Sequence, residues 1–375
     1  MSRGLTHIHV EGFRSLNDVD LEPGPVTVLI GANGSGKSNL IALLKMVALM
    51  RTGSLRRFVG ESGGASALLH YGPKETPELT LRLEFDDEGA TNAYAASLGH
   101  AAGDSLRFLG ETVEHRPAPT AEPRSFNLGA GHPESSLEKY ASDPQQHTAR
   151  TVRWWLEGMS FFHFHDTSLQ SPLRQNARRE DARYLRSDGS NLAAYLLNLA
   201  QGSSEDDAKA WRRIEGLVQR VAPFIKRLLP TLVDPGHAER SAVRLDWLDE
   251  RDHLFGSHHL SDGTLRAIAL ITALAQPKAR LPRFITIDEP ELGLHPAALT
   301  VLVSLVRSVA SRCQVLLATQ SPALLDHFEP EEVVVAERLD GATRFQRLAP
   351  QRLAEWLEEY ALSELYEKNL LGGRP

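Results

Sequence analysis

The stretch GANGSGKS at positions 31–38 constrains the fold of this 375-residue chain more than any other feature. It follows the apolar run VTVLI (26–30), which reads as a buried strand, and leads into NLIALLKMVALM (39–50), which reads as a helix. The stretch matches the pattern G-x-x-x-x-G-K-[ST] at every position, in which a glycine-rich turn directs backbone N–H groups at phosphates. A strand, a phosphate loop and a helix in this order predict an α/β fold with a nucleotide site.

The positions of this loop carry separate expected roles. Lys37 is expected to reach the β- and γ-phosphate oxygens, and Ser38 to offer its hydroxyl to Mg²⁺. No N-K-x-D motif, which would read guanine, occurs in the sequence, so ATP is the expected nucleotide. The other predicted ATP contacts in and beside the loop are Asn33, Gly34, Ser35, Gly36 and Asn39.

The stretch RFITIDEPE (283–291) predicts the partner motif of the phosphate loop. Its apolar strand ends in Asp288 and Glu289, at the strand end where ligands bind in open α/β sheets. Adjacent carboxylates at such an edge are costly unless something uses them. We expect Asp288 to hold Mg²⁺ through its water shell and Glu289, as a catalytic residue, to polarise the attacking water. The alternative is a solvated loop with two acidic residues.

The stretch HLSDGTLR (259–266) predicts a turn that leads directly into a second apolar helix. Ser261, Asp262 and Gly263 are cap and turn residues, and a helix start presents free N–H groups that suit an anion. The chain therefore carries two anion-binding helix starts. An ordinary N-cap, in which Ser261 bonds only its own helix, is the alternative.

Periodicity predicts the fold class. The strictly alternating ELTLRLEF (78–85) indicates a half-buried strand of an antiparallel layer, whereas strands and helices alternate from residue 264 onward, as in a parallel sheet. Five segments are predicted on this basis. They are an N-terminal ATPase lobe (1–111), a Pro/Gly/Ser-rich loop insertion (112–150), a helical lobe (151–240), a C-terminal ATPase lobe (241–345) and a C-terminal helical tail (346–375).

The motifs and their order resemble the ABC-type ATPase heads of the RecF, SMC and OLD group. The resemblance is strongest to bacterial RecF-like AAA family ATPases that lack a coiled coil and a Toprim domain. It rests on VEGFRSLNDVDLEPGPVTVLIGANGSGKSNL, LSDGTLR, IDEPELGLHP, ATQSP and the tail LYEKNLLGGRP. It implies a P-loop NTPase of ABC-ATPase head type, with a mixed sheet, an antiparallel β layer and a helical lobe.

The resemblance also implies a mechanism. Such heads hydrolyse MgATP as ATP-induced head-to-head dimers, in which Ser261, Asp262 and Gly263 would contact the ATP of the second copy in trans. Arg14 in GFRSL matches a family arginine near the phosphates, with an ordinary surface arginine as the alternative. Gln320 in ATQSP stands where many relatives carry His; its amide can bond the γ-phosphate or the attacking water but cannot titrate.

The biology implied by the resemblance is DNA repair or anti-phage defence, with DNA and a separately encoded effector or nuclease as further partners. Only about 40 residues follow the last predicted strand (331–337), too few for a Toprim nuclease domain, so no intrinsic nuclease activity is expected. One rival is an ATP-gated switch or scaffold with little hydrolysis. Another is a transporter ATPase subunit, which would need a membrane partner and an LSGGQ signature.

Composition favours a cytoplasmic protein without a membrane partner. Cys313 is the single cysteine, which excludes an internal disulfide and suits a reducing compartment. The sequence has no signal-peptide core and no run of about 18 apolar residues. The net charge of −7 neither supports nor excludes nucleic-acid binding, because a local basic face would be enough.

Two histidine patterns carry weaker signals. FHFHD places His163 and His165 on one face of a strand with Asp166 next, which is metal-ligand spacing, although a structural or phosphate-side role is favoured. His7 and His9 alternate outward on the first strand and are predicted to be simply exposed.

A basic stretch and a missing glutamine complete the sequence signals. LRQNARREDARYLR (173–186) reads as a helix that either tracks DNA phosphates or, as Glu180 and Asp181 favour, is solvated and salt-bridged. The glutamine of the Q-loop has no clear position; Gln170 and Gln175 are merely nearby in sequence.

Overall fold

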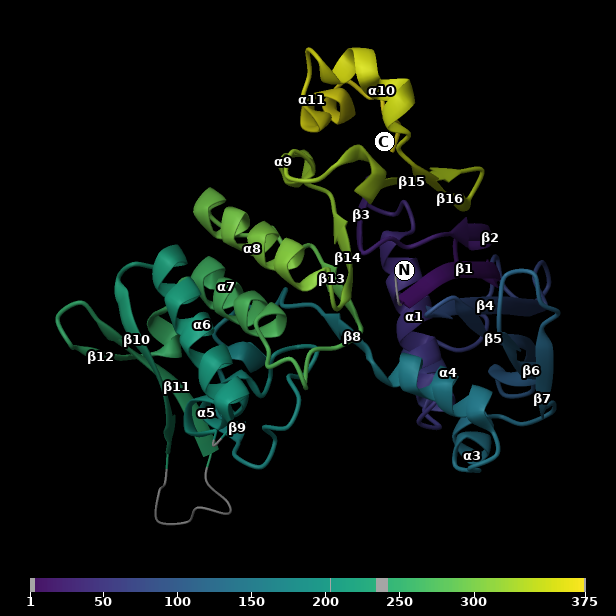
Figure 1. The fold of residues 1–375 in the computed structure, drawn as a ribbon, viewed down its shortest axis with the longest axis horizontal. Helices are drawn as coiled ribbons and strands as arrows, with labels where there is room; N and C mark the ends of the chain where they lie inside the picture. The colour runs from purple at the N-terminus through teal and green to yellow at the C-terminus, as the bar shows by residue number, and fades with distance from the viewer. Residues whose placement is uncertain (1–3, 203, 234–241, 374–375) are drawn as a thin grey trace. The chain divides into compact units, whose positions relative to one another are not determined.

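In the computed structural model the chain forms two compact units, and Figure 1 labels the helices and strands that belong to them. The first comprises Met1–Met159, Arg283–Thr286 and Cys313–Pro375, and the second comprises Ser160–Pro282 and Ile287–Arg312. The residues that the structure describes are 4–202, 204–233 and 242–373.

An antiparallel sheet forms one part of the first unit. Its strands lie in the order β2-β1-β4-β5-β6-β7. In that order they span Leu16–Leu21, Gly4–Phe13, Glu78–Asp87, Ala90–Ala101, Ser105–Arg116 and Arg124–Gly129. The alternation predicted from ELTLRLEF is confirmed in β4, where the leucines and Phe85 are buried on one face.

Residues 112–150 differ from the loop insertion expected from the sequence. They include the end of β6, all of β7, the helix α3 (Leu137–Ala141) and the start of α4 (His147–Glu157). Long-range contacts give this stretch its structure, since the fully buried Glu111 accepts hydrogen bonds from the Tyr94 hydroxyl (2.7 Å) and the Ser136 amide (2.8 Å). Such contacts leave no periodic signal in the sequence.

The predicted α/β layer is a six-stranded sheet in the order β16-β15-β3-β14-β13-β8, and the boundary between the units falls within β13 and β8. In that order the strands span Ala342–Arg347, Val333–Leu339, Val26–Ile30, Gln314–Thr319, Phe284–Asp288 and Met159–Phe162. β3 runs parallel to β14 and β15, as predicted, and β16 returns antiparallel to β15. The helices α1, α2, α9, α10 and α11 of this unit span Lys37–Met50, Leu55–Glu61, Pro322–Leu325, Pro350–Leu357 and Leu362–Glu367.

The second unit joins helices to a small antiparallel sheet. The strands β9, β10, β11 and β12 span Ala177–Arg178, Ile225–Leu232, Ala242–Asp249 and Leu254–Gly256. The helices α5, α6, α7 and α8 span Leu192–Gln201, Glu205–Val221, Asp262–Leu274 and Pro296–Val309. No helix in the described ranges is both long enough and apolar enough to cross a membrane.

Two stretches expected to be helical are not helical throughout. Within the helical lobe predicted at 151–240, the apolar stretch 210–230 is not one helix: α6 ends at Val221 and β10 begins at Ile225, because Pro223 interrupts the helix and Leu228 pairs with Trp247 of β11. The basic stretch 173–186 contains only a 3₁₀ turn and the strand β9. There, the Asn191 amide binds the carbonyls of Asp181 and Tyr184, which stabilises turns in place of a helix.

Candidate nucleotide site

The phosphate loop lies between the fully buried strand β3 and the first turn of α1 in the first unit. Gly36, the residue before α1, has φ of 108°, a left-handed conformation that favours glycine. A Cβ atom at this position would lie 1.9 Å from Thr343 Oγ1. Both the backbone angle and the close approach of Thr343 therefore require glycine, and the loop matches the turn predicted from the sequence.

The Lys37 side chain folds back onto the start of its own loop. Its side chain is buried, and its Nζ donates to the carbonyls of Gly31 (2.6 Å) and Ala32 (3.0 Å). Of the loop residues close to Lys37 in the sequence, Asn33 and Ser38 are exposed, whereas Ser35 is buried. Ser35 Oγ has no hydrogen-bond partner among the described residues, so this buried hydroxyl suits a phosphate oxygen.

A chain of hydrogen bonds supports the loop from outside the motif. Asn39 Nδ2 donates to Ser15 Oγ (2.7 Å), which lies 2.7 Å from Thr343 Oγ1. The Thr343 hydroxyl donates in turn to the Ser35 carbonyl (2.9 Å), so Ser15 must donate to Thr343. Ser15 and Thr343 were missed at the sequence level, because neither belongs to a motif and their partners are far away in the chain.

Arg14 lies at the start of this hydrogen-bond chain. Its guanidinium donates to Asn39 Oδ1 at 3.5 Å, and its backbone N–H donates to the Leu68 carbonyl. The residue has φ of 50°, and burial lowers the pKa of its guanidinium. The structure thus brings together two predicted ATP contacts, Arg14 and Asn39, while their contact with a nucleotide remains a prediction.

Gln320 lines a cavity of about 620 Å³ that opens beside the phosphate loop. It directly follows β14, and the Ser321 amide donates to Thr319 Oγ1 (2.9 Å), which fixes the turn after the strand. The cavity is also lined by Gly31, Ala32, Asn33, Pro322, Tyr366 and Glu367. Gln320 and three residues of the loop thus line one cavity, while its contact with the γ-phosphate or the attacking water stays a prediction.

The C-terminal tail contributes to the same cavity, which sequence reasoning missed. The Ala32 amide of the loop donates to the Gly373 carbonyl (2.9 Å), and the Tyr366 hydroxyl donates to the same carbonyl (3.0 Å). The family resemblance includes the tail LYEKNLLGGRP but implies no role for it. Its glycine-rich end, LLGG, was the available signal.

In the second unit, Asp288 and Glu289 follow one another at the end of β13. Glu289 has φ of 45°, an uncommon left-handed conformation for a residue with a side chain. The His165 ring nitrogen Nε2 lies 3.0 Å from the Asp288 carbonyl oxygen. His165 thus contacts the backbone of the acidic pair.

The alternative of a metal site at His163, His165 and Asp166 has no support in the described part of the chain. The rings of His163 and His165 lie 6.4 Å apart between centroids. The described residues contain one group of His and carboxylate ligand atoms close enough to hold a metal ion, and it lies elsewhere, at His9, Asp18 and Asp20.

The helix start of α7 has the geometry of an N-cap. Ser261 Oγ accepts a hydrogen bond from the Thr264 amide (3.2 Å), as in the alternative reading of this residue. A Cβ atom on Gly263 would lie 2.1 Å from the Gly293 carbonyl oxygen, so close packing requires glycine there. Asp262 is exposed and pairs with Arg174 (2.7 Å). Contact of this segment with ATP in trans stays a prediction.

Two buried arginines organise the second unit around these motifs, and sequence reasoning missed both roles. The Arg174 side chain is 6% exposed and donates to the carbonyls of Thr167 (2.8 Å), Ser257 (2.6 Å) and Leu260 (3.0 Å). Arg266 of α7 donates to the carbonyls of Phe164 (2.7 Å), His165 (2.8 Å) and Leu292, and burial lowers its pKa. Each arginine thus holds together loops that lie far apart in the sequence.

The fold and the phosphate loop define a P-loop ATPase head of ABC type, RecF-like and SMC-like in architecture. The family described as "AAA domain, putative AbiEii toxin, Type IV TA system" matches residues 26–326, and the chain belongs to this family. The group resemblance predicted from the motifs is thereby confirmed.

Curated relatives agree with this assignment. The chain is 26% identical over 235 residues to the DNA replication and repair protein RecF of Stutzerimonas stutzeri, covering 61% of this chain and 57% of that protein. Alignment to RecF of Pseudomonas aeruginosa covers 63% of that protein, so the chain spans less than two thirds of these relatives. The OLD nuclease of Thermus scotoductus is 25% identical over 99% of this chain and 68% of that protein.

Solved structures show the same fold. An Smc head domain derived from Pyrococcus furiosus, solved with an extended coiled coil and the C-terminal domain of ScpA, matches with a TM-score of 0.57 at 15% identity. The match covers 96% of this chain and 99% of that one. An SmcHead bound to the C-winged helix domain of ScpA matches with a TM-score of 0.58 at 14% identity, over 94% and 99% of the two chains.

Proposed function

We propose that this protein hydrolyses ATP with Mg²⁺ and that hydrolysis is coupled to the pairing of two copies. The observation that carries the proposal is the phosphate loop itself. Its left-handed Gly36, the buried Lys37 and the unpartnered Ser35 hydroxyl fit the β- and γ-phosphates of a nucleotide. ATP is the nucleotide proposed, in line with the family to which the chain belongs.

In this proposal each motif residue has one role. Lys37 and the loop N–H groups bind the phosphate oxygens, while Ser38 and Asp288 would hold Mg²⁺, which neutralises phosphate charge. Glu289 accepts the proton of the attacking water as its oxygen bonds to the γ-phosphorus. The bond from that phosphorus to the β–γ bridging oxygen breaks, which releases ADP and phosphate. Gln320 orients the water or the γ-phosphate through its amide.

Pairing of two copies would complete the site in trans. Ser261, Asp262 and Gly263 lie at an exposed or half-exposed helix start, where free N–H groups favour an anion. We propose that this helix start caps the γ-phosphate bound by a second copy. The N-cap bond of Ser261 to its own helix is compatible with this role when the Thr264 hydroxyl, 2.8 Å away, donates to Ser261 Oγ, because Ser261 then keeps its own proton to donate.

Hydrolysis and pairing can be tested together. Glu289→Gln should bind MgATP, lose hydrolysis and accumulate as a dimer, measured by phosphate release and by light scattering. Lys37→Ala is the matched control, which should lose both binding and dimer formation. A Glu289→Gln protein that stays monomeric with saturating MgATP, together with a Ser261→Arg variant of unchanged ATPase rate, would refute capping in trans.

The alternative function is an ATP-gated switch that hydrolyses ATP very slowly and controls a separate effector. Gln320, which cannot titrate, is the observation that favours it. Turnover measured with and without DNA separates the two functions, since robust DNA-stimulated hydrolysis excludes a pure scaffold. We further propose a role in DNA repair or anti-phage defence, which the names of the RecF and OLD nuclease relatives support. Proteins and nucleic acid that co-purify with Glu289→Gln would identify the partner.

A further inference from the structure

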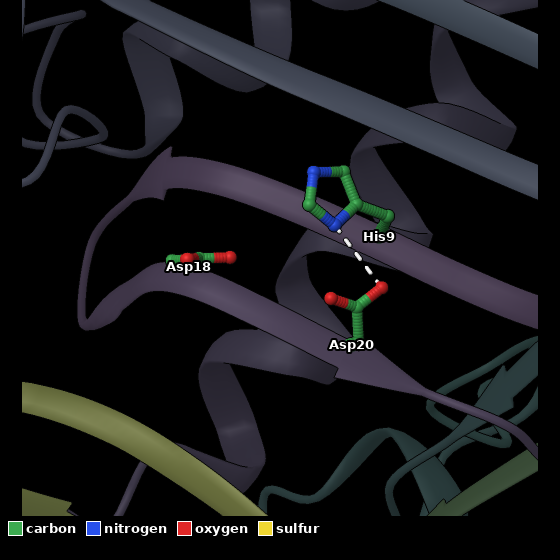
Figure 2. Close-up of side chains that lie close together, drawn as sticks. All are labelled: His9, Asp18 and Asp20. Atoms are coloured by element: carbon green, nitrogen blue, oxygen red, sulfur yellow. Dashed lines mark hydrogen bonds and ion pairs between the residues drawn. The ribbon is translucent and has the colours of Figure 1, made fainter.

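Histidine and carboxylate side chains gather on the β1–β2 hairpin, outside the nucleotide site. His7 and His9 are two residues apart on β1, so both point to the same face of the sheet. Asp18 and Asp20 have the same spacing on β2, and the register places His9 directly opposite Asp20. In Figure 2, His9 and Asp20 face each other from these neighbouring strands, with Asp18 on the same strand as Asp20.

The candidate ligand atoms of this cluster lie close together, where His–Asp hydrogen bonds hold them. Asp20 Oδ1 lies 2.8 Å from His7 Nε2 and 3.1 Å from His9 Nδ1. One ligand atom each from His9, Asp18 and Asp20 lies within 4.8 Å of the others. Zinc bonds of about 2.0–2.2 Å in a tetrahedron separate neighbouring ligand atoms by roughly 3.3 Å. His7 lies outside this three-residue group and meets it through Asp20 Oδ1.

The second ring nitrogen of His9 also has a partner of the kind found at metal sites. Glu11 Oε1 lies 3.4 Å from His9 Nε2, on the side of the ring opposite to Nδ1. Glu11 is itself held, because its Oε2 accepts a hydrogen bond from Thr80 Oγ1 (3.1 Å). A carboxylate behind a ligating imidazole fixes its orientation and tautomer and raises its basicity.

We propose that His9, Asp18 and Asp20 form a site for a divalent transition-metal ion of the zinc type, with His7 as the fourth ligand after a side-chain rotation. Imidazole nitrogens combined with carboxylates favour Zn²⁺ and its neighbours, whereas Mg²⁺ and Ca²⁺ prefer oxygen ligands alone. Four protein ligands fill a tetrahedral shell, so the ion would be structural. The His7 and His9 side chains are 30% and 28% exposed, which leaves them accessible to an ion from solvent.

The position of the cluster suggests what the ion would do. It would link β1 to β2, and the turn between these strands carries Arg14 and Ser15. Both residues belong to the hydrogen-bond chain that supports the phosphate loop. A metal ion on the hairpin therefore restrains the strands that present this chain, without any contact of its own to a nucleotide.

Metal binding to the full-length protein, without nucleotide and at neutral pH, tests the site. Titration with Zn²⁺ by calorimetry should give one site per chain that millimolar Mg²⁺ does not displace. Co²⁺ should bind with visible absorption typical of tetrahedral N/O ligands. His9→Ala should weaken Zn²⁺ binding roughly tenfold or more and abolish the Co²⁺ bands. Asp20→Asn, which keeps the size of the side chain, should do the same.

His100→Ala is the matched control. His100 is a half-exposed histidine of the same sheet that faces one carboxylate, Asp104, at 3.2 Å, so its loss should leave the zinc affinity unchanged. Circular dichroism verifies the fold of each variant. Absence of Zn²⁺ binding by the wild-type protein at micromolar metal overturns the proposal. Equal affinity of wild type and a folded His9→Ala or Asp20→Asn variant overturns it as well, since the ion would then bind elsewhere.

Discussion

Thr343→Val probes the support of the phosphate loop from outside its motif. The substitution keeps the size and branching of the side chain and removes only the hydroxyl. That hydroxyl donates to the Ser35 carbonyl at 2.9 Å and lies 2.7 Å from Ser15 Oγ. Thr343 is 1% exposed and Ser35 is 4% exposed, so water does not replace the lost partner.

The expected magnitude follows from what each partner loses. The Ser35 carbonyl becomes a buried acceptor without its donor, a change that costs about 1–3 kcal/mol. Ser15 keeps the hydrogen bond from Asn39 Nδ2 (2.7 Å), so its loss is partial. We therefore expect a total of about 2 kcal/mol, concentrated in the loop and the first turn of α1.

Nucleotide affinity is the most direct measurement of this change. If ATP binding must first restore the loop conformation, the whole cost appears in Kd, and about 2 kcal/mol corresponds to about 30-fold because each ~1.4 kcal/mol is tenfold. Titration of a fluorescent ATP analogue into Thr343→Val should therefore show binding weakened by up to about 30-fold. Hydrogen exchange should show faster exchange of the loop amides and unchanged exchange in the second unit.

Two controls isolate the hydroxyl. Thr343→Ser keeps the hydroxyl and loses the methyl group, so it should retain most of the nucleotide affinity. Thr300→Val removes an exposed hydroxyl that donates to the Pro296 carbonyl within α8, and it should change neither measurement. If Thr343→Val binds ATP and exchanges its loop amides as the wild type does, the hydrogen-bond chain does not support the loop.

Three further predictions concern single positions. Gly263→Ala places a Cβ 2.1 Å from the Gly293 carbonyl oxygen and should destabilise the protein by about 1–3 kcal/mol in urea denaturation, whereas Gly60→Ala, with open space in α2, should not destabilise it. Glu289→Gly should abolish ATPase activity without loss of stability, because glycine relieves the left-handed backbone (φ 45°) at a gain of up to ~1 kcal/mol; marked destabilisation would contradict this. Burial raises the pKa of the Cys313 thiol from 9.0 to about 12, so the thiol should resist iodoacetamide at mildly alkaline pH. The free energy of unfolding should fall as the pH rises between these two values, because only the unfolded thiol ionises there. Cys313→Ala should remove that fall.

The motifs that the sequence predicted are local, and their local geometry was predictable for that reason. The phosphate loop, the acidic pair after β13 and the Ser261 cap each involve consecutive or nearly consecutive residues. Their supports are not local. Thr343 lies 308 positions from the Ser35 carbonyl that it binds, and Arg174 lies 88 positions from Asp262. One sequence contains no pattern that links such pairs.

The same distinction explains the errors in secondary structure. The apolar residues of the segment 210–230 suit a helix locally, yet beyond Pro223 the pairing of β10 with β11 decides the conformation. In 112–150 the prolines indicate a loop, whereas the buried Glu111 and its partners hold a strand and a helix together. Tertiary contacts override local propensity in both stretches.

The pairing of Asp262 with Arg174 leads to a last prediction about the second anion-binding helix start. A carboxylate in the first turn of α7 is favourable to the helix dipole but repels a phosphate. Arg174, 2.7 Å away and fixed by three backbone carbonyls, supplies a positive charge that offsets it. If α7 caps the ATP of a second copy, Asp262→Asn removes one negative charge and leaves Arg174 facing the phosphate. ATP-dependent dimer formation by Glu289→Gln should then need less ATP when Asp262→Asn is added, measured by light scattering. Glu205→Gln, which removes an exposed carboxylate at the start of a different helix, α6, is the control. If both substitutions leave the ATP requirement unchanged, the charge at this helix start does not face a nucleotide, and Arg174 serves only to fix the turn before α7.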